Sequence, residues 1–421
     1  MRLKIVTTIG LIILWSILVI AVVLAEVFWF ARPAVRPGNL AVIENYLVQK
    51  LSHATERELG SAALILIQNG QIAATHQFGI ADAETKAPVK LDRTLYQLAS
   101  VSKLVTAWGV MKLIEDGRLA LDKPVSHYLK RWQFPESEYR DKVTTRHLLS
   151  HTAGLDDLFG YAGFLPAEKI QTLEESLTLT RDATSGNPRG VKVSREPGKN
   201  WLYSGGGYTV LQLLIEEITH QSFADYMAEF ILQPLGMEKS NFDWQAIADR
   251  GRARDLATSF DERLNISSPR RYTATAAASL YTTPQDMARF VQAYTQQNPV
   301  LSQKTLMLMM TPQPGAHQDW GLGHALYVAN GADGYVVGHD GANIPALGHT
   351  VRINPATGNG LVLMISGNLH LASALGDDWI YWETGKLTVN ARLRILGDRL
   401  VPAIVGIGLG AIAIVLWKLI K

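Results

Sequence analysis

Ser100 and Lys103 have side chains suited to nucleophilic catalysis, and they stand three residues apart in Ser100-Val101-Ser102-Lys103. The pair falls at the expected first turn of a helix, so both side chains would share one face, about 5 to 6 Å apart. A lysine partly buried against apolar neighbours loses its proton more easily and can then accept the proton of a serine hydroxyl. Free N–H groups at the helix start would stabilise negative charge that develops nearby. The spacing predicts a serine nucleophile with a lysine base. The alternative is an ordinary exposed pair at the helix start, because roughly one such spacing is expected by chance in a chain this long.

The surroundings of this pair closely resemble the serine β-lactamase family, in particular the branch that holds class C β-lactamases, DD-peptidases and related esterases. The resemblance continues in the expected order over most of the chain between its two apolar ends. The segments that carry it are 98–103, 117–125, 148–155, Tyr203-Ser204-Gly205, 234–237 and His339-Asp340-Gly341. The resemblance implies an enzyme that forms an acyl-enzyme on Ser100.

Tyr203 fits the second element of that family, a tyrosine followed two residues later by asparagine. By resemblance, Tyr203 shares and relays a proton beside Lys103, and the alternative is a tyrosine that only packs in the core. Gly205 stands at the substrate-binding position where the family has its asparagine, so the amide that would hold a substrate carbonyl is absent. Because some relatives also carry glycine there, this departure weakens a β-lactamase assignment more than a hydrolase assignment.

His339-Asp340-Gly341 fits the third element, a strand triplet that reads His-X-Gly in the esterase-like branch. Period-two alternation places His339 and Gly341 on one face of the strand and Asp340 on the other. By resemblance, the N–H of Ala342 joins that of Ser100 in an oxyanion hole, and Gly341 lets the substrate approach the strand backbone. His339 would bind a carboxylate only when protonated, or a neutral group by a hydrogen bond, and the alternative is a structural histidine at a strand end.

Two other clusters suggest different chemistry, and we set both aside. His147 and His151 have a four-residue spacing that suits zinc, but no third ligand is evident and the resembling family has a structural turn here. Gly205-Gly206-Gly207 lacks the lysine and hydroxyl pair of a phosphate-binding loop, so we expect a turn there. No Gly-X-Ser-X-Gly of an α/β-hydrolase is present. We therefore expect a site with no metal and no cofactor.

The elements that must position these residues follow a clear order along the chain. Apolar runs at 62–67 and 72–78, joined through Asn69-Gly70, predict a β-hairpin, and further strands are expected at 335–339, 349–353 and 360–366. Helical spacing dominates the middle, as in 101–114, 207–218, 222–231 and the capped segment that starts at Thr283-Pro284, while 39–51 predicts an earlier packing helix. We expect an α+β fold with an antiparallel sheet lobe flanked by helices and a helical insertion lobe at about 92–280.

The composition limits the class of protein. The 421 residues carry 40 basic and 38 acidic side chains, mixed along the whole length, so no basic surface for nucleic acid is indicated. The absence of cysteine excludes disulfides, thiol nucleophiles and thiolate metal sites. The central domain, expected at 33–398, is long enough for a large hydrophobic core or two packed lobes.

Two uncharged apolar stretches predict membrane segments at the ends of the chain. Residues 5–25 follow Arg2 and Lys4 and can cross a bilayer core of about 30 Å, so we expect a signal anchor at 5–30, the alternative being a cleaved signal peptide. Residues 400–417 precede Lys418 and predict a second transmembrane helix, the alternative being a helix in the interface because of Pro402.

This pattern predicts an orientation in a bacterial cytoplasmic membrane. The tails 1–4 and 418–421 would be cytoplasmic and the domain 33–398 would lie on the periplasmic side, as Arg2 and Lys4 favour. Arg392, Arg394 and Arg399 oppose this orientation, but long translocated domains largely escape the charge rule.

The reading that combines these observations is a membrane-anchored serine hydrolase of amide or ester bonds. Its expected substrates are peptides ending in D-amino acids, in peptidoglycan or a secreted peptide, chosen by loops such as 159–165 and 186–200. The alternatives are an esterase or a weak β-lactamase. A different class, an inactive binding or scaffold protein of the envelope, stays open because of Gly205 and Asp340. The expected partners are a small peptide or ester and the lipid bilayer, with no nucleic acid.

Overall fold

The computed structural model describes residues 2–25, 35–57, 59–157, 160–184, 186, 188–316, 319–331 and 334–420. Residues 26–30 of the expected anchor and Phe159 of the expected pocket loop lie outside this description. The chain divides into two compact units, Asn39–Gly376 and the paired terminal segments Met1–Gly38 with Asp377–Lys421. Each unit is described in turn.

A six-stranded antiparallel sheet is the framework of the larger unit, with the order β2-β1-β10-β9-β8-β7. Its strands are β1 (Ser61–Gln68), β2 (Gln71–Gly79), β7 (Ala325–Ala329), β8 (Tyr335–Asn343), β9 (Leu347–Asn354) and β10 (Asn359–Ser366). Every residue of β9 is buried, and so is every residue of β1 except the last, which suits central strands covered on both faces. Strands from the two ends of the domain pair directly, Ser61 with Ser366, so the expected sheet lobe with an insertion is confirmed.

The hairpin between β1 and β2 forms as the Asn-Gly pair predicts. Asn69 and Gly70 both have positive φ, 52° and 76°, which is the backbone that a two-residue turn of this twist requires. Gln68 pairs with Gln71 directly across the turn.

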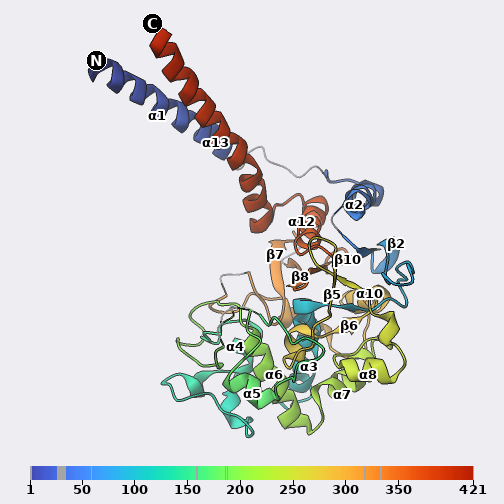
Figure 1. The fold of residues 1–421 in the computed structure, drawn as a ribbon. Coiled ribbons are helices and arrows are strands. Elements are labelled where there is room, and N and C mark those ends of the chain that lie inside the picture. Colours follow the sequence, from blue (N-terminus) through green and yellow to red (C-terminus); the bar gives the residue numbers. More distant parts are fainter. Residues whose placement is uncertain are drawn as a thin grey trace. The chain divides into compact units, whose positions relative to one another are not determined.

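The insertion between β2 and β7 is mainly helical and forms a separate lobe beside the sheet (Figure 1). Its α-helices are α3 (Ser102–Glu115), α4 (Thr145–Leu149), α5 (Leu173–Thr178), α6 (Gly205–Thr219), α7 (Phe223–Met227), α8 (Trp244–Asp249), α9 (Thr275–Ala278), α10 (Pro284–Gln292) and α11 (Gln303–Met309). Its other elements are the short strands β3 (Tyr96–Gln97), β4 (Ser259–Phe260), β5 (Ile266–Ser267) and β6 (Tyr281–Thr282) and the single turns η2 (Ala99–Val101), η3 (Val125–His127), η4 (Arg140–Lys142), η5 (Ala228–Leu232) and η6 (Ala253–Asp255). The preceding helix α2 (Leu40–Thr55) packs on β1 and β2.

Helix α3 lies at the centre of this lobe and is buried on nearly all sides. Only Ile114, Lys112 and Glu115 of its residues escape burial, and the helix contacts α6, α9 and β8. A helix that is apolar all round belongs in a protein interior, so α3 holds its first turn in a fixed position against the sheet. The helix ends at Glu115, just before Gly117 with φ 72°, as the sequence predicts.

The terminal unit contains two long helices, α1 (Arg2–Ala25) and α13 (Val389–Ile420), which run side by side (Figure 1). The indole Nε1 of Trp15 donates a hydrogen bond to the Gly406 carbonyl, 3.3 Å away, and a Cβ at Gly410 would clash with this indole. Within α13, Val389–Trp417 is long and apolar enough to cross a membrane, and α1 carries a shorter apolar stretch, Ile9–Ala25. A last helix, α12 (Leu371–Thr384), joins the two units in sequence.

Candidate active site

Ser100 lies in the η2 turn that leads directly into α3, and Lys103 lies in the first turn of that helix. The Lys103 ammonium donates a hydrogen bond to Ser100 Oγ over 3.1 Å, so the structure brings together the two residues that the spacing paired. Ala99, just before the serine, has φ 45°, a conformation that L-residues avoid and that is often found at functional sites. The neighbouring Ser102 hydroxyl is already used, because it accepts the Leu280 N–H at 2.9 Å.

Lys103 lies in surroundings that favour its neutral form. Its side chain is buried, donates to the Ala277 carbonyl at 2.7 Å and lies 5.1 Å from the Tyr203 ring centre. Burial lowers the pKa of Lys103 to about 7, against a smaller opposing effect of the Asp157 carboxylate. A substantial share of the amine is therefore unprotonated near neutral pH and can accept the Ser100 proton.

Tyr203 comes from the segment just before α6 and reaches the same place. Burial raises the pKa of Tyr203, while a hydrogen bond with Ser100 lowers it by a smaller amount. The phenol consequently stays protonated where Lys103 is already neutral. Near neutral pH the Lys103 amine therefore offers a lone pair, whereas the Tyr203 phenol still holds its proton.

Strand β8 carries the predicted triplet past Ser100. A Cβ at Gly341 would clash with the Leu98 carbonyl and stand 3.2 Å from the Ser100 nitrogen, so only glycine lets the strand approach so closely. The exposed Ala342 follows it. Because β7 pairs only with the first half of β8, up to Gly338, the segment from His339 onward has a sheet partner on the β9 side alone.

Asp340 points to the opposite face of β8, as the alternation predicts. The buried Arg352 pairs with this carboxylate at 2.8 Å, and the Thr350 hydroxyl donates to it at 2.5 Å. The pair with Arg352 and the hydrogen bonds from Arg352 and Thr350 outweigh burial and lower the pKa of Asp340. Asp340 is therefore a structural carboxylate of the sheet.

His339 is buried on the nucleophile side, with its ring centre 6.2 Å from that of Tyr203. Burial, with a further effect of the Lys103 charge, lowers the pKa of His339 to about 3. The imidazole is neutral at physiological pH, so His339 can act only through neutral hydrogen bonds and not as a cation for a carboxylate.

Gly205 is the first residue of α6, and the expectation of a turn at residues 205–207 is wrong. Ser204 caps the helix by accepting the Gly207 N–H at 2.8 Å, and Asp157 accepts the Gly206 N–H at 2.6 Å. These bonds to the helix start offset the low helix propensity of three glycines. A Cβ at Gly206 would meet Asp157 Oδ2 at 2.8 Å, so the close contact requires glycine there.

Asp157 is a site residue that the sequence does not reveal. Its carboxylate accepts from Ser204 Oγ at 2.6 Å and acts on the charge of Lys103. Burial raises the pKa of Asp157 despite these hydrogen bonds. The only signal in the sequence is a helix that begins with three glycines, which would need an acceptor from elsewhere in the chain.

The two histidines considered for zinc have separate roles. His147 belongs to the capping box of α4, whereas His151 lies beyond the end of that helix with φ 57°. The His151 ring lies 4.5 Å from the Tyr203 ring, between centres, and 4.9 Å from the Trp320 ring. His151 and Trp320 thus border the site, although neither was predicted to.

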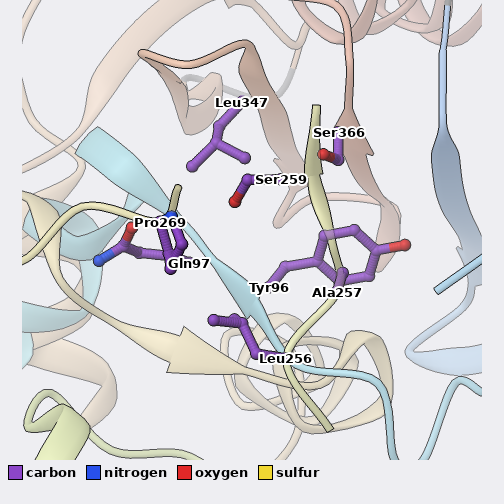
Figure 2. Close-up of a pocket in the computed structure, with 8 residues that line it drawn as sticks. All are labelled: Tyr96, Gln97, Leu256, Ala257, Ser259, Pro269, Leu347 and Ser366. Atoms are coloured by element: carbon purple, nitrogen blue, oxygen red, sulfur yellow. The ribbon is translucent and has the colours of Figure 1, made fainter. Parts of the chain in front are cut away.

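A small pocket lies next to the strand that leads to the nucleophile, and Figure 2 shows it around Gln97 of β3. The Gln97 side-chain amide donates to the Tyr281 hydroxyl at 2.7 Å, and the Gln97 backbone carbonyl accepts from His349 Nε2 at 2.9 Å. The pocket is lined by Tyr96, Gln97, Leu256, Ala257, Ser259, Pro269, Leu347 and Ser366, and none of these is a predicted site residue.

Comparison with characterised proteins places this geometry in a family. A family model described as Beta-lactamase matches residues 45–386. The chain is 32% identical over 186 residues to Penicillin-binding protein 4* of Bacillus subtilis (strain 168), covering 44% of this chain and 38% of that protein. It is 32% identical over 196 residues to Esterase EstB of Burkholderia gladioli, covering 44% of this chain and 48% of that protein. The chain thus spans less than half the length of these two relatives.

The fold agrees with a solved structure of the same kind. The octameric penicillin-binding protein homologue from Pyrococcus abyssi superposes with a TM-score of 0.67 over 83% of this chain and 78% of that chain, at 24% identity. With the family model over residues 45–386 and the expected two-lobed fold confirmed, the chain belongs to the Beta-lactamase family, a family of serine hydrolases.

Proposed function

We propose that this chain is a hydrolase that forms an acyl-enzyme, with Ser100 as nucleophile, Lys103 as base and Tyr203 as proton donor. The observation that carries the proposal is the 3.1 Å contact between Lys103 Nζ and Ser100 Oγ, together with the lowering of the Lys103 pKa to about 7. An inactive scaffold would have no need of a buried, readily deprotonated lysine beside a serine hydroxyl.

The proposed reaction has two balanced halves. Ser100 Oγ bonds to the carbonyl carbon of the substrate as its proton passes to Lys103. The bond from that carbon to the leaving nitrogen or oxygen then breaks, and the leaving atom takes a proton from Tyr203, which Lys103 reprotonates. In the second half water attacks the ester, Ser100 regains its proton, and a carboxylic acid leaves.

The negative oxygen of the intermediate needs donors on the other side of the carbonyl. We assign this role to the backbone N–H groups of Ser100 and Ala342, and the closeness of Gly341 to the Ser100 nitrogen supports the assignment. Gly205 offers only backbone at the substrate-binding position. The lack of a side-chain amide there makes a β-lactamase the weaker reading.

The substrate is proposed to be an amide or an ester. A peptide with D-amino acids, in peptidoglycan or a secreted peptide, is supported by the similarity to a penicillin-binding protein. An esterase is the second candidate, favoured by the neutral His339, which supplies no cation for the free carboxylate of a carboxypeptidase substrate.

The location proposed is the periplasmic side of a bacterial cytoplasmic membrane. The apolar helix Val389–Trp417 and the shorter apolar stretch Ile9–Ala25 support membrane anchoring. We accordingly keep 33–398 as the catalytic domain, with a helical lobe at about 92–280, between spans at 5–30 and 400–417 and tails at 1–4 and 418–421.

Labelling with a fluorescent fluorophosphonate tests the proposal. Wild-type protein should be labelled with a mass shift on the peptide that contains Ser100, and Ser100→Ala should lose the label. Ser126→Ala, in the distant turn η3, is the matched control and should keep it. Equal labelling of Ser100→Ala and wild type would refute the nucleophile assignment, and no labelling of wild type would favour the scaffold reading.

A further inference from the structure

Four aromatic side chains form one wall beside the proposed nucleophile: His151, Tyr203, Trp320 and His339. The His151 ring lies 4.5 Å from Tyr203 and 4.9 Å from Trp320, and the His339 ring lies 5.4 Å from Trp320 and 6.2 Å from Tyr203, between ring centres. The Lys103 charge lowers the pKa of both histidines, and Tyr203 hydrogen-bonds with Ser100. The wall therefore borders the reacting atoms.

The hydrogen bonds of His151 determine where its proton lies. Its Nδ1 is 3.1 Å from the backbone nitrogen of Ser204, whose N–H can only donate, so Nδ1 holds a lone pair. Burial, first, and the charges of Lys103 and His339 lower the pKa of His151 well below its usual value, so the ring is neutral. In a neutral imidazole the proton is then on Nε2, which makes that atom a donor.

His339 has the opposite tautomer. Its Nδ1 is 2.5 Å from the Asp340 carbonyl oxygen, which can only accept, so Nδ1 carries the proton. The other nitrogen, Nε2, is left with a lone pair and is an acceptor.

Three polar atoms of this wall are buried without a hydrogen-bond partner among the described residues: His151 Nε2, His339 Nε2 and Trp320 Nε1. Buried polar atoms nearly always have partners in folded proteins, and an exception asks for an explanation. Together they offer two donors and one acceptor. Trp201, whose ring is 5.6 Å from that of Trp320 and which is exposed, continues the aromatic wall to the surface.

We propose that this wall is a substrate subsite for an uncharged group that both accepts and donates hydrogen bonds, namely a primary carboxamide or a hydroxyl. The inference rests on the proposed acyl-transfer function and names the substrate class. A carboxylate would accept hydrogen bonds from His151 and Trp320, but it has no proton to donate, so its lone pairs would repel the lone pair on His339 Nε2. An ammonium group would donate a hydrogen bond to His339 Nε2, but it could not accept from the N–H groups of His151 and Trp320. Only a neutral group with both capacities satisfies all three atoms.

A matched pair of ester substrates tests this subsite in the full-length protein. The phenylacetylglycyl esters of lactic acid and of lactamide differ only in a carboxylate against a carboxamide in the leaving group. At pH 7 the lactamide ester should have at least a tenfold higher kcat/KM. His339→Arg places a guanidinium, which stays charged when buried, in the wall and should reverse the preference, while the exposed His127→Gln should leave it unchanged.

Both esters are also measured as competitors of fluorophosphonate labelling, so that binding is seen even where turnover is slow. Equal use and equal competition by the two esters in the wild type, or a preference for the lactate ester, would overturn the subsite, whether or not His339→Arg folds. Hydrolysis of p-nitrophenyl acetate, which lacks the tested group, separates the two levels of the proposal. If this ester is cleaved and Ser100 is labelled, a failed preference counts against the subsite alone; if neither occurs, the acyl-transfer function itself fails.

Discussion

Lys103 is the residue on which the proposed chemistry depends, because burial and the Asp157 carboxylate act on its pKa in opposite directions. With this pKa near 7, the active neutral amine is lost as pH falls, so kcat/KM should decrease tenfold per pH unit below about pH 6. The raised pKa of Tyr203 should keep the alkaline side of the profile flat beyond pH 9. A bell-shaped profile centred below pH 6 would contradict the assignment of Lys103 as base.

Removal of the Asp157 charge should shift this profile in a defined direction. In Asp157→Asn the carboxylate that raises the Lys103 pKa is gone, so the acid limb of kcat/KM should move to lower pH. Asp156→Asn is the matched control, since Asp156 pairs with the exposed Lys192 at 3.3 Å. A role for Asp157 limited to the start of α6 would lower stability without moving the acid limb.

Strand β8 positions the site through one residue without a side chain. In Gly341→Ala the new Cβ clashes with the Leu98 carbonyl, so β8 must move away from Ser100. We expect a loss of at least a hundredfold in kcat/KM and about 1–3 kcal/mol of stability, the usual cost of overpacking. Kinetics and denaturant unfolding would measure both. Gly397→Ala, in α13, is the control, because a Cβ there meets nothing within 4 Å.

The elements that could be predicted are those with a strong local pattern. The β1–β2 hairpin followed from Asn69-Gly70, and α10 followed from Thr283, whose side chain caps it as expected. Strand β8 was expected to end at His339 but continues to Asn343, since β9 supplies its pairing. The short strand β7 and the helical start at Gly205 were not predicted, because tertiary partners stabilise them and no local signal does.

The site residues likewise divide into those with a local sequence pattern, which could be predicted, and those brought together only by tertiary structure. The spacing of Ser100 and Lys103 is local and was predicted. The approach of Asp157, His151 and Trp320 depends on loops that meet only after folding, and no pattern in the sequence connects them. The face of Asp340 was predictable from alternation, but its partner Arg352 on β9 was not.

Buried histidines make the stability of the whole molecule sensitive to acid. Burial lowers the pKa of His324 and His349 to about 4 and of His339 to about 3. These pKa values lie below the value of about 6.5 in the unfolded chain. The free energy of unfolding is therefore highest above that pH and decreases as pH falls toward 4. Each such histidine that takes up a proton on unfolding adds about 1.4 kcal/mol per pH unit to the slope at its steepest.

Denaturant unfolding of the full-length protein between pH 7 and pH 4.5 would measure this slope. His349→Gln should reduce this slope by the equivalent of about one proton taken up on unfolding, whereas His127→Gln, at an exposed position, should leave the slope unchanged. A slope that stays the same in His349→Gln would show that this histidine is protonated in the native state.

The pairing of α1 with α13 can be tested by cross-linking, since the chain has no cysteine of its own. Trp15→Cys combined with Gly410→Cys should be joined by a short bifunctional thiol reagent that spans the space of the indole, as the indole and this glycine are in contact. Trp15→Cys with Val415→Cys, further along α13, is the control. Equal yields from both pairs would argue against a specific helix contact.

The pairing of β1 with β10 has a consequence for how the chain acquires its fold. Ser61 meets Ser366 across the sheet, so the two central strands cannot pair until almost the whole domain has left the ribosome. Contacts between such distant parts of a chain form slowly, and until then the β1–β2 hairpin leaves the edge of the apolar strand β1 that later pairs with β10 uncovered. Folding should therefore be limited by this late closure, and the unfinished domain would need protection from aggregation until β10 is available.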